Sequence, residues 1–247
     1  MQTERPYVLT IAGLDPSSGA GLTADVKTFE QLKVYGLAVC TGLTLQTENE
    51  FVSVSWRKIE EVKQEMNLLL NKYPVKAVKF GIVPSFEFLR ILLECIKEHD
   101  RKIQVVVDPV WRSSTGFEFN QDNFTNDVLK NISLITPNLP ELEFLSGAKS
   151  NEQYLNEIRE FTNILLKGGH KISGTGLDVL YTKTTTVEFI SEQKNISAKH
   201  GSGCVLSAAI TAELARGENL ENACALGKKY IENFLSTNKS LLGFHAA

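Results

Sequence analysis

KHGSGCVLSAAITAELARG, the stretch from Lys199 to Gly217, predicts the start of a buried helix. Two glycines flank a serine at residues 201–203, and a run rich in Ala, Leu and Ile follows directly. Such a helix start has backbone N–H groups without intrahelical partners and a partial positive charge, so it suits a phosphate or a phosphoryl group in transfer. Cys204 falls in the first turn, where the same dipole should favour its thiolate. Taken alone, the glycines fit a tight packing turn equally well, and Cys204 fits a small buried hydrophobic residue better.

Upstream of this stretch, β-branched apolar runs alternate with helical periodicity from residue 7 to about residue 166. This alternation predicts an α/β fold with a mainly parallel sheet and helices on both faces. Two closely spaced strands then predict a β-hairpin, two helices close the chain, and we expect one domain over residues 1–247. The predicted strands cover residues 7–12, 37–44, 75–80, 103–107, 134–136, 164–166, 177–181 and 186–190. The predicted helices cover residues 22 to at most 36, 59–72, 86–99 with Ser85 as cap, 122–130, 154–162, 203–216 and 220–236.

The composition is that of an ordinary globular protein, with 43% hydrophobic and 22% charged residues among 247. A net charge of −3 gives no basic footprint for nucleic acid or anionic membrane. The first residues lack a signal-peptide pattern, and no apolar run approaches the ~18–20 residues of a spanning helix. The four cysteines form no C-x-x-C pair, which argues against zinc or a disulfide framework. We therefore expect a soluble protein of the reducing cytoplasm.

Glycines and polar residues follow the predicted strands where each strand ends. The carboxyl ends of parallel strands meet at one edge of a sheet, where ligands of open α/β sheets bind. We therefore expect one site to be built from the residues at these ends, namely Gly13, Gln46, Gly81, Asp108, Asn138 and Lys167.

Three residues near this edge have side chains suited to phosphate and metal chemistry. Asn138 and Glu141, in TPNLPE, offer oxygen ligands for Mg²⁺ or its waters. Lys167, in KGGH, offers a cation for a phosphate. The structural alternatives are a proline-containing turn with Glu141 in the first turn of a helix, and a lysine that extends to solvent. His170 is interpreted as a polar loop residue.

Two residues nearer the N-terminus can recognise a heterocycle. Asp25, a turn into the first helix, could accept hydrogen bonds from a ligand amine, and the Gln46 amide could bind both donor and acceptor edges. From these residues alone, a solvated helix acid is the favoured interpretation of Asp25, and loop capping is an alternative for Gln46. The preceding loop GLDPSSGAG, residues 13–21, lacks the Lys-Ser/Thr of a P-loop.

Eight segments carry a family resemblance that runs nearly end to end: TIAGLDPSSGAGLTADVKTF (10–29), LTLQT (43–47), VKFGIV (78–83), VVDPV (106–110), ITPNLPE (135–141), LLKGGH (165–170), LDVLY (177–181) and HGSGCVLSAAI (200–210). In this order they resemble the hydroxymethylpyrimidine/phosphomethylpyrimidine kinases of thiamine biosynthesis. These enzymes belong to the ribokinase-like superfamily, so the resemblance implies a three-layer α/β/α fold.

The resemblance also implies a role for each matching residue. The pyrimidine would be surrounded by Gly13, Asp25, Gln46 and Val110, with Gln46 and Asp25 recognising its ring nitrogen and amino group. The anion hole for the transferred phosphoryl group would consist of Gly201, Ser202 and Gly203, with Cys204 beside the acceptor oxygen. The Mg²⁺ and nucleotide-phosphate side would be formed by Asn138, Glu141 and Lys167, with the metal bound by Asn138 and Glu141 directly or through water.

Some positions depart from the family pattern. Ser114 stands in place of a lysine near the end of the segment after VVDPV, with Arg112 nearby as a substitute. Ile82 stands where methionine is frequent. The KISGTG stretch is compact and the hairpin after it is tight. These departures bear on the second phosphorylation step and on the lid rather than on the fold.

The activity implied by the resemblance is ATP- and Mg²⁺-dependent phosphorylation of 4-amino-5-hydroxymethyl-2-methylpyrimidine and then of its monophosphate, by a homodimer. Cys204 would take or relay the proton of the hydroxymethyl group. Pyridoxal kinase is the nearest alternative, because pyridoxal also offers a ring nitrogen and a hydroxymethyl group. A non-catalytic pyrimidine- or nucleotide-binding regulator is the alternative from another class.

Overall fold

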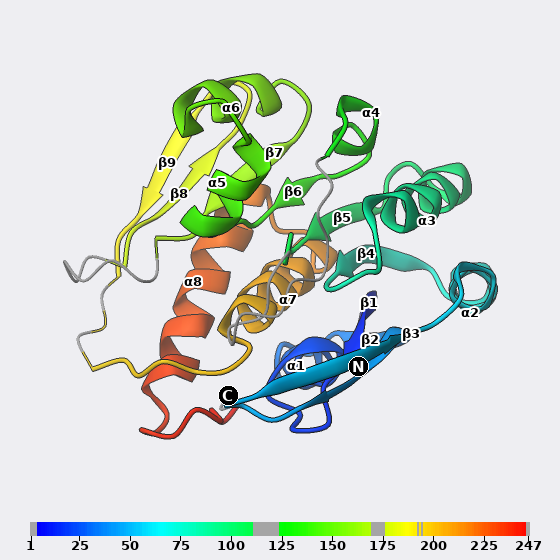
Figure 1. Ribbon diagram of the computed structural model, residues 1–247, viewed down its shortest axis with the longest axis horizontal. Coiled ribbons are helices and arrows are strands. Elements are labelled where there is room, and N and C mark those ends of the chain that lie inside the picture. Colours follow the sequence, from blue (N-terminus) through cyan, green and yellow to red (C-terminus); the bar gives the residue numbers. More distant parts are fainter. Residues whose placement is uncertain (1–3, 111–123, 169–175, 192, 194, 246–247) are drawn as a thin grey trace.

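The computed structural model describes residues 4–110, 124–168, 176–191, 193 and 195–245. Its strands are β1 (Tyr7–Leu14), β2 (Tyr35–Gln46), β3 (Phe51–Trp56), β4 (Val75–Phe80), β5 (Gln104–Val107), β6 (Leu134–Ile135), β7 (Asn163–Leu166), β8 (Asp178–Tyr181) and β9 (Thr186–Phe189). Over the described residues these form one sheet in the order β3-β2-β1-β4-β5-β6-β7-β8-β9 (Figure 1).

The middle of the sheet is parallel and its margins are antiparallel. Strands β2, β1, β4, β5, β6 and β7 pair in parallel, whereas β3 pairs antiparallel with β2, and β8 and β9 form an antiparallel hairpin beside β7. The mainly parallel sheet and the late hairpin are therefore confirmed.

The helices are α1 (Gly21–Gln31), α2 (Ile59–Lys72), α3 (Phe86–His99), α4 (Asn126–Leu129), α5 (Leu139–Ser146), α6 (Asn151–Ile158), α7 (Ser202–Ala215) and α8 (Leu220–Ser236). The boundaries of α2 and β4 are as predicted, and Ser85 caps α3 by accepting a hydrogen bond from the Phe88 amide. Helix α4 is much shorter than expected, and residues 122–123 of that prediction lie outside the described residues.

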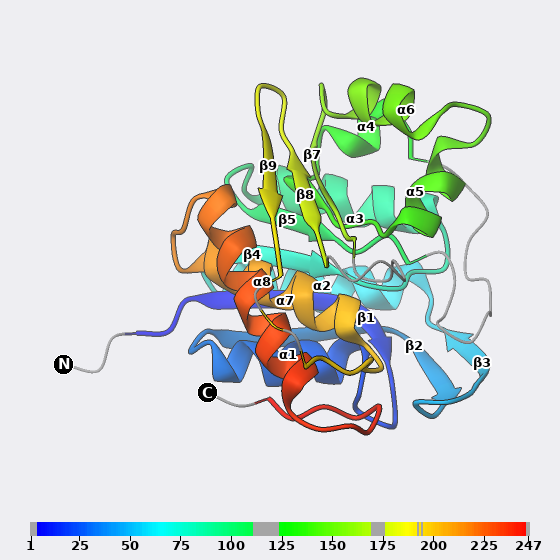
Figure 2. The same ribbon diagram turned by 90° about the vertical axis from the view of Figure 1, so that its left-hand side faces the viewer.

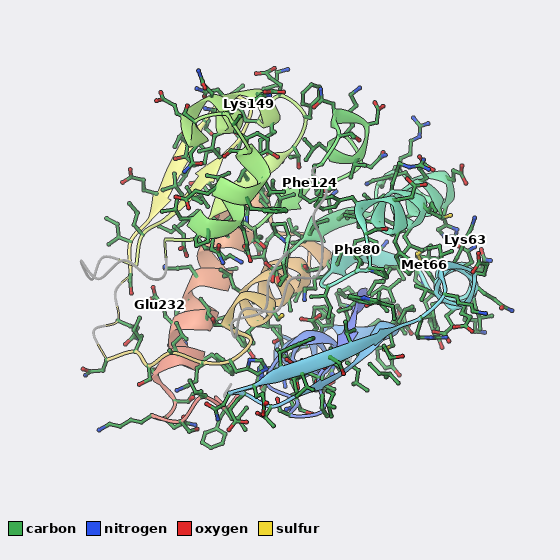
Figure 3. All side chains as sticks on the ribbon, viewed as in Figure 1. Lys63, Met66, Phe80, Phe124, Lys149 and Glu232 are labelled. Atoms are coloured by element: carbon green, nitrogen blue, oxygen red, sulfur yellow. The ribbon has the colours of Figure 1, made fainter. Side chains whose placement is uncertain are left out.

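Two hydrophobic layers enclose the sheet. Alternate residues of β1 face opposite ways: Leu9 and Ile11 pack with α2 and α3, whereas Val8 packs with α1 and α7. Figure 3 labels two residues of the first layer, Met66 on α2 and Phe80 at the end of β4, which belong to one core. Helices α2–α6 thus cover one face and α1, α7 and α8 the other, as Figure 2 also shows, giving the expected three layers.

Strand β3 was not predicted from the sequence. The second half of β2 runs beyond β1 and pairs with β3, with Gln46 opposite Phe51. Three apolar side chains of this hairpin are exposed, namely Leu43, Leu45 and Val52. The sequence does carry a signal for this strand, because FVSVSW alternates apolar and polar residues as a half-buried strand does.

The strand order reverses at β1, because the chain adds β2 on one side of it and later adds β4 on the other side. Such a switch point opens a crevice at the carboxyl ends of the strands. The β1–β2 register also shifts between Ala12 and Leu14, at Gly13. No helix of the described residues has both the length and the apolar composition needed to span a bilayer.

Candidate active site

A pocket of about 370 Å³ lies at this edge of the sheet. It brings together most of the residues predicted for the site, which are Gly13, Gln46, Val110, Asn138, Glu141, Lys167, Gly201, Ser202, Gly203 and Cys204. The residues at the strand ends thus lie together around one pocket, and their roles stay predictions. Asp25 is the one predicted residue that does not line it.

The start of α7 forms one wall of the pocket. Gly201 has φ +73°, and a Cβ there would lie 2.1 Å from the carbonyl oxygen of Gly19, so only glycine fits. Within the described part of the chain, the amides of Gly203 and Cys204 donate to no protein acceptor. These free N–H groups at a helix N-terminus can bind an anion.

The start of α1 faces the same pocket through Ala20 and Gly21. Asp15 holds the loop before it by accepting hydrogen bonds from the amides of Ser17 (2.8 Å) and Ala20 (2.9 Å). His200 Nε2 lies 2.9 Å from Asp15 Oδ2, which joins this loop to α7. Burial alone would raise the pKa of Asp15, but the hydrogen bonds from His200 and Ser17 hold it below its ordinary value. Sequence reasoning missed Asp15, although an Asp in a Ser/Gly-rich turn is a common organiser of such loops.

Opposite α7, Lys167 lies between two carboxylates. Its Nζ is 2.8 Å from Asp108 Oδ1 and 3.6 Å from Glu141 Oε2. Burial alone would lower the pKa of Lys167, but the negative charges of Asp108 and Glu141 raise that pKa above its ordinary value. A Cβ on Gly203 would lie 3.3 Å from Lys167 Nζ, so the cation touches the wall formed by α7. Lys167 therefore lines the pocket and does not extend to solvent.

Asn138 and Glu141 form a capping box at the start of α5. The Asn138 side chain accepts from the Glu141 amide (2.8 Å), and Glu141 Oε2 accepts from the Asn138 amide (2.7 Å). The structural alternative, with Glu141 in the first turn of a helix, is thus confirmed, while both residues also line the pocket. Burial raises the pKa of Glu141 to about 7.

One side of the pocket has apolar side chains around a single amide. Ile82 and Val110 line it, and Gly13 leaves room for Ile82, whose Cδ1 would lie 2.4 Å from a Cβ at residue 13. The Gln46 amide is oriented by donating from Nε2 to Thr44 Oγ1 (2.9 Å). Phe51 also lines the pocket, and it was missed because β3 was missed.

Asp25 does not line the pocket, and its complete burial shows that a solvated helix acid is the wrong interpretation, whereas its contact with a ligand stays a prediction. The side chain is fully buried, and Lys79 Nζ donates to both of its oxygens at 2.8 Å. Thr10 Oγ1 donates to Oδ2 at 2.6 Å, which leaves little capacity for a ligand amine. Lys79 was missed, although a lysine inside an apolar, doubly covered strand signals a buried counter-ion.

The thiol of Cys204 faces the pocket, but its predicted thiolate character is not supported. Burial raises the pKa of Cys204 to about 11, against the opposing influence of the Lys79 ammonium and a hydrogen bond from the Gly21 amide. The helix dipole was expected to favour the thiolate of Cys204, but removal of the side chain from water favours the neutral thiol. Lys79 thus links Asp25 to Cys204 through its charge.

Three residues singled out from the sequence, Arg112, Ser114 and His170, lie outside the described residues. Within the described part, no group of three or more His, Cys, Asp or Glu side chains is arranged as a metal site. A cation here would therefore need oxygens from water or a ligand in addition to Asp108 and Glu141.

Comparison with known proteins finds a matching family and similar solved structures. Residues 15–246 match the phosphomethylpyrimidine kinase family. A hydroxymethylpyrimidine/phosphomethylpyrimidine kinase of Aquifex aeolicus is 33% identical over 94% of this chain and 95% of its own. A phosphomethylpyrimidine kinase structure from Clostridium difficile 630 is 32% identical, with a TM-score of 0.76 over 93% of this chain and 99% of that one. An ADP complex of Bacillus subtilis pyridoxal kinase is 28% identical, with a TM-score of 0.81 over 98% of each chain.

Proposed function

We infer the reaction from the family of this chain, because the chain belongs to the phosphomethylpyrimidine kinase family and is a small-molecule kinase. We propose that it transfers the γ-phosphoryl group of ATP to 4-amino-5-hydroxymethyl-2-methylpyrimidine and then phosphorylates the resulting monophosphate. The observation that carries this proposal is the placement of free amides at the start of α7 across one pocket from the Gln46 amide and its apolar neighbours.

The aromatic ring of the substrate would lie between Ile82, Val110 and Phe51. Its polar edge would be read by Gln46, whose amide has a donor and an acceptor. The hydroxymethyl group would then point toward Cys204. Asp25 supports this arrangement from below through Lys79, without touching the ring.

In the transfer step, the hydroxymethyl oxygen forms a bond to the γ-phosphorus as the bond from that phosphorus to the bridging oxygen breaks. The electron pair of the broken bond stays on ADP. The amides of Gly203 and Cys204, together with Lys167, would stabilise the charge that spreads over the transferred group. Glycine at 203 allows both kinds of donor to reach the same phosphoryl group.

The proton of the hydroxymethyl group would pass to the Cys204 sulfur. A sulfur accepts a proton only as thiolate, and a pKa of about 11 leaves most of the empty enzyme as thiol at neutral pH. The first step should therefore speed up as pH rises through 7 to 9. In the second step the acceptor is a phosphate oxygen, which is already largely ionised at pH 7. Cys204 should consequently matter less for the second step.

The donor set fits Mg²⁺, which prefers carboxylate and water oxygens. Asp108 and Glu141 would hold the ion, and Asn138 would fix Glu141 through the capping box rather than bind the metal with its own side-chain oxygen. When bound, the ion supplies positive charge beside the phosphates of the nucleotide. Lys167 contributes one positive charge beside the two carboxylates Asp108 and Glu141, so the added positive charge of the ion would be favourable there.

We also propose a homodimer, located in the cytoplasm. The exposed Leu43, Leu45 and Val52 on the β2–β3 hairpin support the first proposal, because clustered exposed apolar residues mark interaction sites. The four cysteines are free thiols, which fits a reducing compartment. Sedimentation of the chain and of Leu45→Lys tests the dimer, and a wild-type monomer would contradict it.

The activity is tested by ADP release with ATP and Mg²⁺ in the presence of hydroxymethylpyrimidine, its monophosphate or pyridoxal. We expect turnover on the first two. Pyridoxal is included because a pyridoxal kinase structure is similar over 98% of this chain. Turnover on pyridoxal alone would move the assignment to that vitamin, and no turnover would contradict the proposal. Cys204→Ala should reduce kcat for the first step by about 10²–10⁴-fold and for the second step much less.

A further inference from the structure

Lys199, two residues before the α7 wall, has unusual partners for a buried lysine. It is 6% exposed, and its Nζ donates to the carbonyl oxygens of Asn238 (2.5 Å) and Ser240 (2.8 Å). Both acceptors belong to the C-terminal tail, residues 237–245, which follows α8 and returns to the start of α1. The ammonium therefore connects the segment just before Gly201 with the tail that follows the C-terminal end of α8.

Three other largely buried lysines of the described chain are neutralised in a different way. Lys79, Lys167 and Lys228 each have a carboxylate oxygen within 2.9 Å. Among the described residues, no carboxylate lies within ion-pair distance of Lys199, whose ammonium donates to the two tail carbonyls instead. Since a buried charge is costly unless it is well hydrogen-bonded, the two tail carbonyls are what hold this side chain in place.

His200 reinforces the same connection. Its amide donates to the Leu241 carbonyl (2.9 Å), while its ring contacts Asp15 on the opposite side. The Leu242 side chain also packs beside Gly19. The two residues that precede Gly201 are thus fixed to the tail on one side and to the α1 loop on the other.

A movement of Lys199 and His200 would also move the start of α7, where the free amides lie. Gly201 contacts the Gly19–Ala20 backbone so closely that a single Cβ would overlap it. A shift of Lys199 and His200 must therefore re-aim the amides of Gly203 and Cys204, because α7 begins one residue after Gly201.

We propose that Lys199 is a positioning residue for phosphoryl transfer, which acts by tying the anion hole to the C-terminal tail. The inference rests on the proposed function, because it assigns the Gly203 and Cys204 amides to the transferred group. A hydrogen-bond donor displaced by about 1 Å can cost about 100-fold in rate. The effect should fall on kcat, since the pyrimidine is held by Gln46 and its neighbours on another wall.

The test compares Lys199→Met with Lys239→Met, which removes an exposed lysine from the same tail. We expect Lys199→Met to lower kcat about tenfold or more, with the KM for hydroxymethylpyrimidine within about twofold of wild type. Lys239→Met should match wild type, and Lys199→Arg should recover most of the loss. Rates are expressed per pyrimidine-binding site measured by calorimetry, so that unfolded protein does not count.

Asn238→Ala provides a milder variant in case Lys199→Met does not fold. It removes the side-chain oxygen that accepts from the Ser240 amide (2.9 Å) and shapes the tail turn, and it leaves Lys199 intact. We expect a smaller fall in kcat that does not add to that of Lys199→Met. An unchanged kcat in both variants, or a rise in KM alone, would overturn the proposal while wild-type turnover still supports the kinase. Absence of wild-type turnover would instead overturn the kinase assignment, and the inference with it.

Discussion

Replacing Asp25 by Asn should destabilise the protein strongly and leave pyrimidine recognition nearly intact. The pair with Lys79 is fully buried on both sides, at 2.8 Å. In the variant, the amide NH₂ would turn a donor toward an ammonium that has lost its counter-ion. Removing one partner of a buried ion pair costs about 3–5 kcal/mol of unfolding free energy. That is a large part of the roughly 5–15 kcal/mol by which proteins are stable.

Urea unfolding measures this cost, with the midpoint falling and the slope unchanged. Glu30→Gln is the matched control, because Glu30 lies on the same helix as Asp25 and its solvent-exposed ion pair with Arg5 should contribute little to stability. Lys79→Met combined with Asp25→Leu should regain most of the stability, since a buried pair can often be replaced by apolar residues without loss.

Kinetic constants of the folded protein distinguish two roles for Asp25, which are support of Lys79 within the core and contact with the substrate. We expect the KM for hydroxymethylpyrimidine to change by less than about threefold, because Asp25 does not line the pocket and no uniform binding is lost. Normal stability together with a KM raised tenfold or more would refute this reasoning and restore Asp25 as a substrate contact.

Other changes test the site and the tail. Gly201→Ala should lower both stability and kcat, because φ +73° disfavours a side chain and its Cβ would meet the Gly19 carbonyl; thermal unfolding and ADP release measure the two effects. Alkylation of Cys204 by iodoacetamide should be slow at pH 7 and accelerate toward pH 11, as mass spectrometry would follow; a rate already maximal at pH 7 would contradict the buried thiol. Burial lowers the pKa of His245 to about 4, below its unfolded value near 6.5, so the unfolded chain binds more protons between these pH values. Stability should therefore fall as pH drops from 6.5 to 4, and His245→Gln should weaken this dependence.

The arrangement of elements was largely predictable because the chain patterns its strands and helices locally. The segment Ile59–Lys72 has apolar residues at helical spacing, and a strand–glycine–helix order recurs along the chain. Strand β3 was not predicted although FVSVSW alternates apolar and polar residues, because it is a short edge strand directly after the polar segment TENE. Its omission also hid Phe51, which enters the pocket only through pairing with β2.

The site was predictable where backbone geometry decides it and unpredictable where side chains pair across the fold. Glycines at 201 and 203 reveal a close approach through their sequence alone. Asp25 and Lys79 are 54 residues apart, and Asp108 and Lys167 are 59 residues apart, so no local pattern connects either pair. The charge of Cys204 likewise depends on how deeply the fold buries it, which a position in a helix does not specify.

The place of α7 in the chain has a consequence for how the protein is made. This helix packs on β1, β4 and β5, yet it begins only at Ser202. While a ribosome synthesises the preceding residues, the central strands can pair, but the apolar side chains of Val8, Ala77 and Val106 lack their cover. Exposed strands of this kind are prone to aggregate and attract chaperones. Nascent chains stalled before residue 202 should therefore bind a holdase, and release of α7 from the exit tunnel should end that association.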